Sequence, residues 1–520
     1  MPIELDAGDV TVGKWEPFGP SGALMVCGTT SNAGKSTLAA GLCRHYARRG
    51  ARVAPFKGQN MSNNSAVTPG GHEIARAQAW QAAAAGTDPE VGMNPVLVKP
   101  MGERRCQVVV MGRPVGTMTA SEFHRMKPEL LGIVLEALAD LRRRYDVVIL
   151  EGAGSPAEVN LMESDIVNLR LAAEAGIGAV LVGDIELGGV FASLFGTLAL
   201  LPPAHRRLVK GLVVNKFRGD PALFAGGAEQ LEERCGVPCL GVLPWIEGPE
   251  TDSEDSLALD RPLQLEPGAA DGVEAGGPTG VLDVAVVRLP HIANFTDLDP
   301  LRFEPGVRLR WVEDARSLGE PDLLVIPGSK ATVADLAWLR SRGLDHAATA
   351  AKGVVLGICA GYQMLGGTIA DPGGVESCEP QVDGLGLLDA VTTFGPEKVV
   401  RRRRGRLFGE PAAGYQIHHG VVKSSGPALV ELDNGEGDGA AGTTPAGALV
   451  WGTSLHGLLD EDGARAAVLE KVAARAGTAI PHGGCFEAAR QRRIDLLADL
   501  VEEHLDLARL DQVLAEGVRA

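Results

Sequence analysis

Gly28-Thr29-Thr30-Ser31-Asn32-Ala33-Gly34-Lys35-Ser36 is the stretch that decides the fold of the first half of the chain. An apolar run, residues 23–27, precedes it, and a helix-forming stretch, residues 36–49, follows it. A glycine-containing loop between a buried strand and a helix is typical of phosphate-binding loops, because backbone N–H groups and the helix N-terminus can cradle phosphate oxygens. The stretch therefore predicts a nucleotide site rather than a plain strand-to-helix turn.

The spacing of this loop departs slightly from the usual pattern. Five residues rather than four separate Gly28 from Gly34, and counting from Thr29 restores the spacing without the first glycine. The side chains still suit a nucleotide, since Lys35 would neutralise the β and γ oxygens and the Ser36 hydroxyl would hold magnesium. The residues predicted to contact the nucleotide in this loop are Thr30, Asn32, Ala33, Gly34, Lys35, Ser36 and Thr37.

An acidic partner for magnesium is expected at the end of a neighbouring strand. Glu151 directly follows the apolar run 147–150, which makes it the predicted second ligand, with a helix N-cap or loop carboxylate as the alternative. Lys57 follows another apolar run, residues 53–56, and is expected either to face the γ-phosphate or a substrate carboxylate, or to be only solvated.

Apolar runs and helical stretches alternate through the first half of the chain. The runs are continuous rather than alternating with polar residues, as expected of parallel strands that are covered on both faces. Helical stretches such as residues 130–144 separate the apolar runs, and this alternation of strands and helices is typical of an open parallel sheet. The predicted strands are residues 23–27, 53–56, 147–150, 179–182 and 212–214.

The second half is predicted to be another α/β unit, and it begins after a change of composition. Residues 247–280 are rich in Gly, Pro, Asp, Glu and Ala, and residues 267–280 are predicted to be disordered or an insertion. Residues 433–447 are predicted to form a flexible surface loop, and residues 486–508 a closing helix. The predicted strands are residues 284–287, 323–326 and 354–356.

Composition excludes several functions. A chain of 520 residues predicts two to three domains, and its net charge of −17 gives no basic field for nucleic acid or an anionic membrane. The four arginines at 401–404 are a local exception, which we interpret as a solvated loop. The eight cysteines form no paired Cys-x-x-Cys pattern, so we expect neither a zinc site nor a disulfide framework. Residues 1–16 lack an apolar core and no apolar run reaches membrane-spanning length, so a cytoplasmic protein is expected.

A second motif, Gly357-Ile358-Cys359-Ala360-Gly361, lies between an apolar run and a helix-forming stretch. This is the cysteine version of a nucleophile elbow, in which glycines allow a close turn that lifts one side chain above the sheet edge. The Cys359 thiol becomes a nucleophile only if a base can take its proton, and a buried core cysteine is the alternative.

Three histidines compete to be that base. His456 follows a strand-like segment and precedes a loop, and it is preferred over His418 and His419. Gly328, after the predicted strand 323–326, and Ala360, directly after the cysteine, are expected to offer backbone N–H groups to an oxyanion.

These features resemble the class I glutamine amidotransferase domain. In that family the cysteine attacks the side-chain amide of glutamine, and the resulting thioester is hydrolysed to release ammonia. A glutamine four residues after the nucleophile helps to bind substrate there, and Gln363 matches it. The common members also have a glutamate two residues after the histidine, where this chain has Leu458. The resemblance therefore implies a Cys359–His456 dyad, as in the cobyric acid and cobyrinic acid amidase branch, and leaves open what orients the histidine.

An NTP site beside an ammonia source predicts amidation of a carboxylate through an acyl phosphate, in a site that excludes water. At this point the resemblance becomes more specific, because motifs along nearly the whole chain are similar to the cobyric acid synthase family. Only the N-terminal tail and the two flexible segments are not covered. The matching motifs are residues 29–36, 56–65, 151–158, 164–168, 183–191, 214–220 and 288–297.

The resemblance implies that ATP, Mg²⁺ and glutamine serve to amidate the b, d, e and g carboxylates of adenosylcobyrinic acid a,c-diamide, giving adenosylcobyric acid. It implies that Asp165 lies near the acceptor or the acyl phosphate, and that Asn215 reads the adenine base or caps its strand. The third magnesium ligand and the oligomeric state stay open. The other residues expected to bind the corrinoid acceptor are Lys57, Gln59, Asn60 and Asn63.

The resemblance also implies an α/β fold of two domains. Residues 1–248 would form an ATP-binding P-loop domain of the dethiobiotin-synthetase type, residues 249–280 a linker, and residues 281–520 a glutamine amidotransferase-like domain with a C-terminal helix. The main rival is a cobyrinic acid a,c-diamide synthase, against which residues 60–65 argue. A CTP-synthase-like enzyme is disfavoured by the missing glutamate. The third rival, of a different class, is a regulatory P-loop ATPase with a vestigial glutamine domain.

Overall fold

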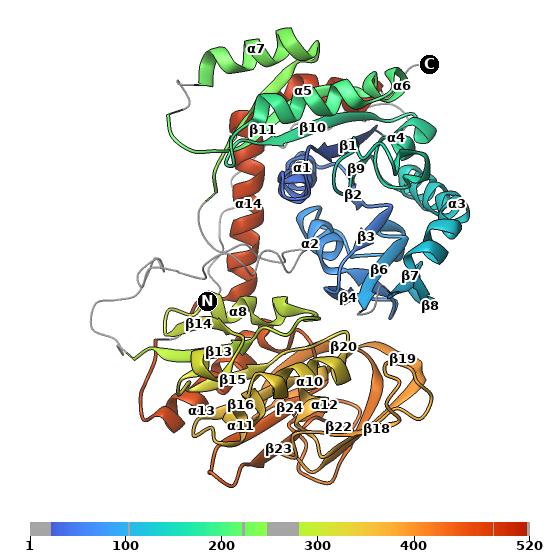
Figure 1. The fold of residues 1–520 in the computed structure, drawn as a ribbon. Coiled ribbons are helices and arrows are strands. Elements are labelled where there is room, and N and C mark those ends of the chain that lie inside the picture. The colour runs from blue at the N-terminus through green and yellow to red at the C-terminus, as the bar shows by residue number, and fades with distance from the viewer. Residues whose placement is uncertain (1–21, 102–104, 221–223, 247–279, 482, 517–520) are drawn as a thin grey trace, which may run out of the picture.

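The structure of the chain, a computed structural model, describes residues 22–101, 105–220, 224–246, 280–481 and 483–516. Two α/β units lie one above the other in Figure 1, each built around its own six-stranded sheet. The acidic segment 1–16 and residues 267–279 of the expected insertion lie outside the described residues. The predicted α/β class with two such units is confirmed.

The sheet of the first unit has the strand order β12-β11-β10-β1-β9-β2, and every neighbouring pair in it is parallel. Its central strands are buried along their whole length, which is why they appear in the sequence as continuous apolar runs. All five strands predicted in this half are present. Their bounds are β1 Gly22–Gly28, β2 Val53–Phe56, β9 Val147–Glu151, β10 Gly178–Asp184, β11 Val209–Phe217 and β12 Cys239–Pro244.

Helices cover both faces of this sheet, so it lies between two apolar cores. One core includes the helix that follows the phosphate loop, and the other includes the long helix α3. The helix α3 has the reciprocal Thr119–Glu122 capping box at its start, which satisfies two backbone N–H groups of its first turn. The helices are α1 Lys35–Arg48, α2 Arg76–Ala84, α3 Ala120–Arg144, α4 Leu169–Ala175, α5 Val190–Leu200, α6 Pro203–Arg206 and α7 Ala225–Cys235.

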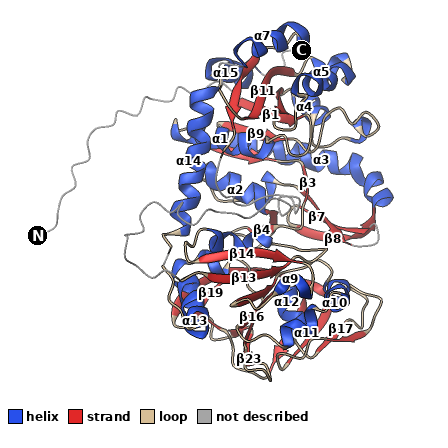
Figure 2. Cartoon of the chain, turned by 60° about the vertical axis from the view of Figure 1, so that its left-hand side comes forward, coloured by secondary structure: helices blue, strands red, loops and turns tan. Residues whose placement is uncertain are grey.

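A small sheet of order β3-β6-β7-β8 and a two-stranded hairpin, β4-β5, are inserted after β2. Both figures of the whole chain place these strands between the two large units (Figures 1 and 2). They are short and partly exposed, and the sequence analysis did not predict them. Their bounds are β3 Gln59–Met61, β4 Ser65–Val67, β5 Glu73–Ala75, β6 Val96–Met101, β7 Arg105–Val110 and β8 Arg113–Thr119.

The second unit has a sheet of order β14-β13-β15-β16-β24-β23, in which only β23 runs antiparallel to its neighbour. The three strands predicted in this half are present. The strands are β13 Leu282–Val287, β14 Val307–Val312, β15 Leu323–Ile326, β16 Val354–Ile358, β23 Ala440–Thr443 and β24 Leu449–Thr453. The helices are α8 Asp299–Arg302, α9 Ala315–Leu318, α10 Thr332–Ser341, α11 Leu344–Thr349, α12 Ala360–Leu365 and α13 Asp462–Ala476.

A further sheet, β18-β17-β19-β21-β22 with β20 paired to β19, completes this unit. Its bounds are β17 Thr368–Ala370, β18 Gln381–Asp383, β19 Ala390–Leu407, β20 Glu410–Ser424, β21 Val430–Leu432 and β22 Gly437–Asp438.

Two predictions fail in this part of the fold. The arginine run 401–404 is not a solvated loop, because it lies in β19, paired with β20. Residues 433–447 are not a free loop either. They contain β22 and β23, and Asp438 is buried where it accepts hydrogen bonds from Thr453 Oγ1 at 2.6 Å and Gln416 Nε2 at 2.9 Å. Pairing with neighbouring antiparallel strands, which the hydrophobic pattern does not reveal, orders both segments.

The C-terminal helices contradict the expected domain division. Residues 486–508 were expected to close the second unit as one helix, but they form α14 Phe486–His504 and the start of α15 Leu507–Glu516. The helix α14 runs from the second unit to the first (Figures 1 and 2), where its buried residues join the core around α1. Leu510 and Leu514 of α15 belong to the same core. The chain thus returns to the first unit at its end.

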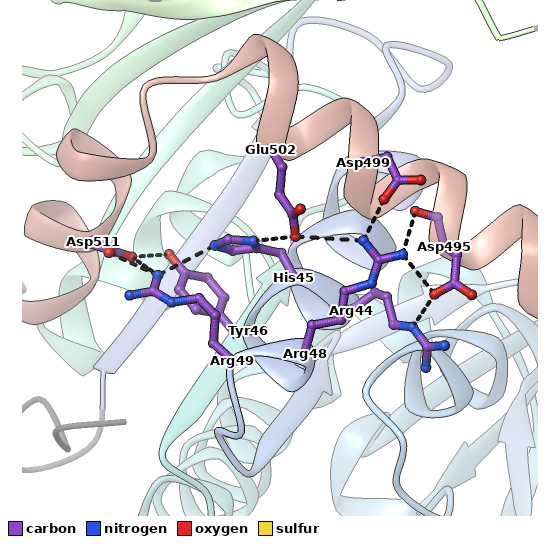
Figure 3. Close-up of polar contacts among 9 residues, drawn as sticks. All are labelled: Arg44, His45, Tyr46, Arg48, Arg49, Asp495, Asp499, Glu502 and Asp511. Carbon is purple, nitrogen blue, oxygen red and sulfur yellow. Dashed lines mark hydrogen bonds and ion pairs between the residues drawn. The ribbon is translucent and has the colours of Figure 1, made fainter. Parts of the chain in front are cut away.

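Ion pairs line the contact between α1 and α14 (Figure 3). Arg48 lies 2.9 Å from Asp495 and 2.6 Å from Asp499, and His45 lies 2.9 Å from Glu502. Such partly exposed pairs stabilise a fold by only about 0–1 kcal/mol each, so the buried leucines carry most of the attachment. The remaining contacts drawn in the figure are Arg44 with Asp495, Arg48 with Glu502, Arg49 with His45, and Tyr46 and Arg49 with Asp511.

We expect Leu510→Ala to destabilise the first unit by about 2–5 kcal/mol, because the side chain is fully buried against its core. Hydrogen exchange should speed up at β1 and β10, which α15 contacts, while β13 and β15 stay protected. The control is Leu496→Ala, whose side chain is 40% exposed on α14 and should change stability by less than about 0.5 kcal/mol. Faster exchange confined to the second unit would contradict the packing described here.

Candidate active sites

The loop after β1 has the strand–loop–helix context that the sequence predicts. Gly34, which precedes α1, has φ 99°, in the region that favours glycine. A Cβ atom at Gly34 would collide with the side-chain amide of Asn215, so a larger residue does not fit. The backbone therefore turns directly into a helix N-terminus, where unpaired N–H groups can receive phosphate oxygens.

Lys35 lies folded over this loop, with its side chain buried. Its ammonium donates hydrogen bonds to the carbonyl oxygens of Thr30 at 2.8 Å, Ser31 at 3.0 Å and Gly154 at 3.2 Å. The loop after β1 and the loop after β9 thus meet at one cation. This arrangement places a positive charge in the cradle, as binding of a nucleotide phosphate requires.

Ser36 and Glu151 meet, as predicted for a magnesium site. The Ser36 hydroxyl donates to Glu151 Oε1 at 2.8 Å, and the Lys57 ammonium lies 2.9 Å from the same oxygen. Gln81 donates to Glu151 Oε2 at 2.5 Å. Burial would raise the pKa of Glu151, but Lys57 and these hydrogen bonds hold it below its ordinary value. An ionised carboxylate beside a hydroxyl fits Mg²⁺, which prefers oxygen ligands.

Asn215 connects the end of β11 to the phosphate loop, since its side-chain amide donates to the Ala33 carbonyl at 2.9 Å. This contact is the strand-end role given as the alternative, and reading of adenine by Asn215 stays a prediction. Thr30 and Asn32 are exposed at the loop, and Thr37 lies in the first turn of α1.

The residues predicted to bind the acceptor do not lie in one cluster. Lys57 is paired with Glu151 rather than solvated, and Asn60 is buried with its amide donating to Gln78 at 2.8 Å. Asn63 lines the cavity that contains Cys359. Asp165 accepts backbone N–H groups of the next turn, and burial raises its pKa. Gln59 is partly buried in β3. Their roles toward the acceptor stay predictions.

Cys359 lies at the sharp turn between β16 and α12, with φ 53° and ψ −107°. Such angles are strained for a residue with a side chain, and they are typical of a nucleophile elbow. Gly361 is required there, because a Cβ atom would collide with the Ile326 carbonyl oxygen. The turn directs Cys359 into a cavity whose walls include Gln363, His418, His419 and His456.

His456 has a carboxylate partner that the sequence analysis missed. Its Nδ1 lies 2.6 Å from Asp297 Oδ2, and the Gly457 N–H donates to Asp297 Oδ1 at 2.8 Å. Asp297 thus provides the partner of His456 that the sequence left open, and Cys359, His456 and Asp297 lie in the arrangement of a triad. Asp297 belongs to a short 3₁₀ helix, Phe295–Leu298, after β13, so it takes the place of the missing glutamate from a distant part of the chain.

Electrostatics suit His456 to exchange a proton with Cys359. Burial would lower the pKa of His456, but Asp297 and Cys359 outweigh it and raise this pKa to about 10. The imidazole also hydrogen-bonds with Cys359. A thiol in this position can pass its proton to the histidine, which holds it as an imidazolium beside the carboxylate.

His418 and His419, the competing histidines, lie in the same cavity, but neither has a hydrogen bond to a carboxylate among the described residues. His418 Nδ1 lies 2.6 Å from the Gly420 carbonyl oxygen, and burial lowers the pKa of His418 to about 4. His419 contacts Gln107 at 3.1 Å, and burial likewise lowers its pKa to about 4. With such low pKa values both are weak acceptors for the proton of a thiol, which favours His456 as the base.

The predicted oxyanion and glutamine-binding residues surround the thiol. Gly328 lies against the imidazole, because a Cβ atom there would be 3.1 Å from His456 Cε1. Ala360 is the first residue of α12, so its N–H has no acceptor within the helix. Gln363 lies one turn further and accepts a hydrogen bond from Thr332 Oγ1 at 3.2 Å. This arrangement fits an acyl-transfer site with backbone donors for an oxyanion.

Residues of the first unit complete this cavity. Asn63 and Lys99 line it together with Lys398 of β19. Glu73 joins the two units, because its carboxylate lies 2.6 Å from both Lys99 and Lys398. Tyr415, which stacks on His456 with ring centroids 5.5 Å apart, donates its hydroxyl to the Ser65 carbonyl oxygen at 2.9 Å.

Four residues of this site were not predicted from the sequence, because contacts between distant parts of the chain bring them there: Asp297, Glu73, Lys99 and Lys398. Asp297 lies inside a motif, residues 288–297, that carried the family resemblance, but no spacing relates it to a histidine 159 residues later. The other three lie on strands that the pattern did not predict, and only the contact between the units brings them together.

Fold and sites together define a P-loop nucleotide-binding unit joined to a Cys-His-Asp glutamine amidotransferase unit. Residues 24–257 match the family of CobQ/CobB/MinD/ParA nucleotide binding domains. Residues 283–464 match the CobB/CobQ-like glutamine amidotransferase domain.

Curated relatives narrow the class. The chain is 50% identical to a cobyric acid synthase of Frankia casuarinae over 96% of this chain and 98% of that one. It is also 50% identical to cobyric acid synthases of Nocardia farcinica and Mycobacterium marinum, over 95% of this chain and 97% of each of theirs. The chain belongs to the cobyric acid synthase family and is a glutamine-dependent ligase. No helix within the described part of the chain is long and apolar enough to cross a membrane.

We expect Asp297→Asn to lower the pKa of His456, because the substitution removes the negative charge that stabilises the imidazolium. Glutamine hydrolysis should fall by at least about 10²-fold, the size of a general acid–base contribution. Histidine-labelled protein titrated by NMR would report the pKa.

The matched control is Asp299→Asn, two residues along the chain, where the carboxylate lies 3.4 Å from Arg302 and outside the triad. It should leave both the His456 titration and the rate of hydrolysis near those of the unchanged protein. If Asp297→Asn behaved like this control, the triad would be refuted.

Proposed function

We propose that the chain uses ATP and glutamine to amidate the b, d, e and g carboxylates of adenosylcobyrinic acid a,c-diamide, giving adenosylcobyric acid in cobalamin biosynthesis. The observation that carries this proposal is the joining of two sites in one chain. The Lys35–Ser36–Glu151 cluster suits a nucleotide, and the cavity of the Cys359 triad has a wall made by the same nucleotide-binding unit. The names of the full-length relatives support the acceptor.

The amidotransferase half would supply ammonia. The Cys359 thiolate attacks the side-chain amide carbon of glutamine, with backbone N–H groups of Gly328 and Ala360 placed to stabilise the oxyanion. His456 then gives its proton to the departing ammonia, leaving a thioester on Cys359. Water, deprotonated by His456, hydrolyses the thioester to glutamate and regenerates the thiol. Asp297 holds the imidazole in orientation throughout.

The ligase half would activate the acceptor. A carboxylate oxygen of the corrinoid attacks the γ-phosphorus of ATP, ADP leaves, and an acyl phosphate forms. Ammonia then attacks the acyl carbon, phosphate leaves, and a proton from the nitrogen passes to solvent. Lys35 would neutralise the phosphate oxygens, while Ser36 and Glu151 would hold a Mg²⁺ ion that offsets phosphate charge.

The surface beside the phosphate loop supports a large acceptor with an apolar ring. Leu187, in the loop after β10, is 90% exposed, and Val159 and Leu161, in the loop after β9, are also exposed. These loops lie at the edge of the sheet where the phosphate loop begins, since β10 and β9 are the neighbours of β1. In open parallel sheets ligands bind at this edge.

The rival functions are less well supported. A regulatory ATPase with a vestigial glutamine domain would not need the complete Cys-His-Asp arrangement. A cobyrinic acid a,c-diamide synthase shares the chemistry and differs in the carboxylates that it amidates, so the acceptor decides between the two ligases.

Incubation with ATP, Mg²⁺, glutamine and the corrinoid a,c-diamide should give four successive small mass decreases, because each conversion of an acid to its amide replaces a hydroxyl group with the lighter amino group. Mass spectrometry of the corrinoid over time checks this outcome. Turnover of cobyrinic acid to the a,c-diamide, without further amidation, would identify the rival ligase. Absence of any corrinoid-dependent turnover would refute both.

Cys359→Ala should abolish glutamine-dependent amidation while leaving amidation with added ammonium chloride, because only ammonia release requires the thiol. The measurement compares corrinoid product formed from the two nitrogen donors. Cys378→Ala is the control, since this exposed cysteine lies outside the triad and the cavity wall. Equal loss with both donors in Cys359→Ala would contradict the division of work between the two units.

A further inference from the structure

Two charged residues in the Cys359 cavity have no part in the chemistry described above. Lys330 follows the Gly328–Ser329 turn after β15, and Glu376 lies in the loop after β17. Both line the same cavity as Cys359 and Gln363. No motif in the sequence predicts a role for either side chain.

Lys330 differs from the other lysines of the cavity. Lys99 and Lys398 are each neutralised by Glu73 at 2.6 Å, whereas the Lys330 ammonium has no hydrogen bond or ion pair to the described part of the chain. Burial, together with the two neighbouring lysines, lowers the pKa of Lys330 to about 7. An anion entering the cavity would stabilise the charged form of this side chain.

Glu376 offers the opposite charge. Its carboxylate accepts hydrogen bonds from Thr332 Oγ1 and the Val333 N–H, each at 3.2 Å. The same Thr332 hydroxyl contacts Gln363, which lies one helical turn from the nucleophile. Burial raises the pKa of Glu376 to about 7, so a cation beside it would stabilise its ionised form.

Both residues are held on anchored loops. Asp335 accepts hydrogen bonds from Ser329 Oγ at 2.6 Å and from the His291 N–H at 3.1 Å, which fixes the turn before Lys330. Asp371 accepts the backbone N–H of Glu376 at 2.8 Å, which fixes the other loop. Pre-organised groups of this kind bind a ligand with little loss of conformational entropy.

We propose that Lys330 and Glu376 recognise the amino-acid end of glutamine, Lys330 binding the α-carboxylate and Glu376 the α-ammonium group. This inference rests on the proposed function, in which glutamine enters the cavity with its amide at Cys359. The α-carbon lies three bonds from the amide carbon, so the two charged groups diverge at the end of the substrate away from the thiol. A pair of opposite charges there selects a zwitterion over a simple amide.

The test compares glutamine with two analogues that each lack one charged group. Glutaramate, the 5-carbon amide acid, has the carboxylate without the ammonium, and 4-aminobutanamide has the ammonium without the carboxylate. Hydrolysis by the full chain should favour glutamine over each by at least about 10-fold in kcat/KM, since each analogue leaves one group of the pair unpartnered.

The variants should remove these preferences selectively. Lys330→Met should raise KM for glutamine at least about 10-fold and abolish the preference for glutamine over 4-aminobutanamide, while the preference over glutaramate remains. Glu376→Gln should abolish the preference for glutamine over glutaramate, while the preference over 4-aminobutanamide remains. Neither should change amidation supported by ammonia. Lys352→Met, at an exposed lysine paired with Glu320, is the control and should keep both preferences.

Other outcomes would overturn the inference. If each variant lost activity equally toward glutamine and both analogues, the residues would be merely structural. If Lys398→Met, rather than Lys330→Met, removed the preference over 4-aminobutanamide, the carboxylate would bind elsewhere. If the wild-type chain hydrolyses glutamine but shows no preference for it over the analogues, the roles of Lys330 and Glu376 would be refuted while the proposed function would stand. A wild-type chain that hydrolyses no glutamine would refute the proposed function as well.

Discussion

Glu73 lies between Lys99 of its own unit and Lys398 of the other, 2.6 Å from each ammonium, and all three side chains are buried. Burial would raise the pKa of this carboxylate, but the two lysines hold it well below its ordinary range. Loss of the Glu73 charge would leave two buried ammonium groups without their carboxylate, and removal of a partner from a buried ion pair typically destabilises by about 3–5 kcal/mol. Lys99 and Lys398 also line the Cys359 cavity. The residues that hold the two units together therefore also form part of the cavity wall.

The base of the triad depends on the same contact. Tyr415 exchanges two backbone hydrogen bonds with His456, stacks on its ring, and donates its hydroxyl to Ser65 of the nucleotide-binding unit. Docking of the units therefore fixes one face of His456, while Asp297 fixes its Nδ1. On the other side of this contact, Asn60 donates to Gln78, which is in contact with Gln81 and so with Glu151. The two sites thus share one packed region of the chain.

The local sequence was sufficient to predict an element where the hydrophobic pattern of its own residues decides its structure. The predicted strands of both large sheets are largely buried apolar runs, so the hydrophobic pattern alone located them, whereas the partly exposed β12, β14 and β23 were not predicted. Residues 433–447 and the arginines 401–404 were misjudged because they form strands that pair with neighbouring strands, while their polar residues interrupt the hydrophobic pattern. The direction of α14 was misjudged for a related reason, since its apolar face fits α1 of the first unit and no local signal names the partner surface.

The sequence by itself determined the two loops that carry the proposed reactive atoms. Gly34-Lys35-Ser36 and the Cys359 elbow are set by neighbouring residues, because glycine conformation and a strand followed by a helix specify them. Only the tertiary structure decided what surrounds these atoms. Asp297 reaches His456 across 159 residues, and Lys330 and Glu376 face the cavity from separate loops. Such partners are selected by packing and charge in a buried space, which the local order of residues does not encode.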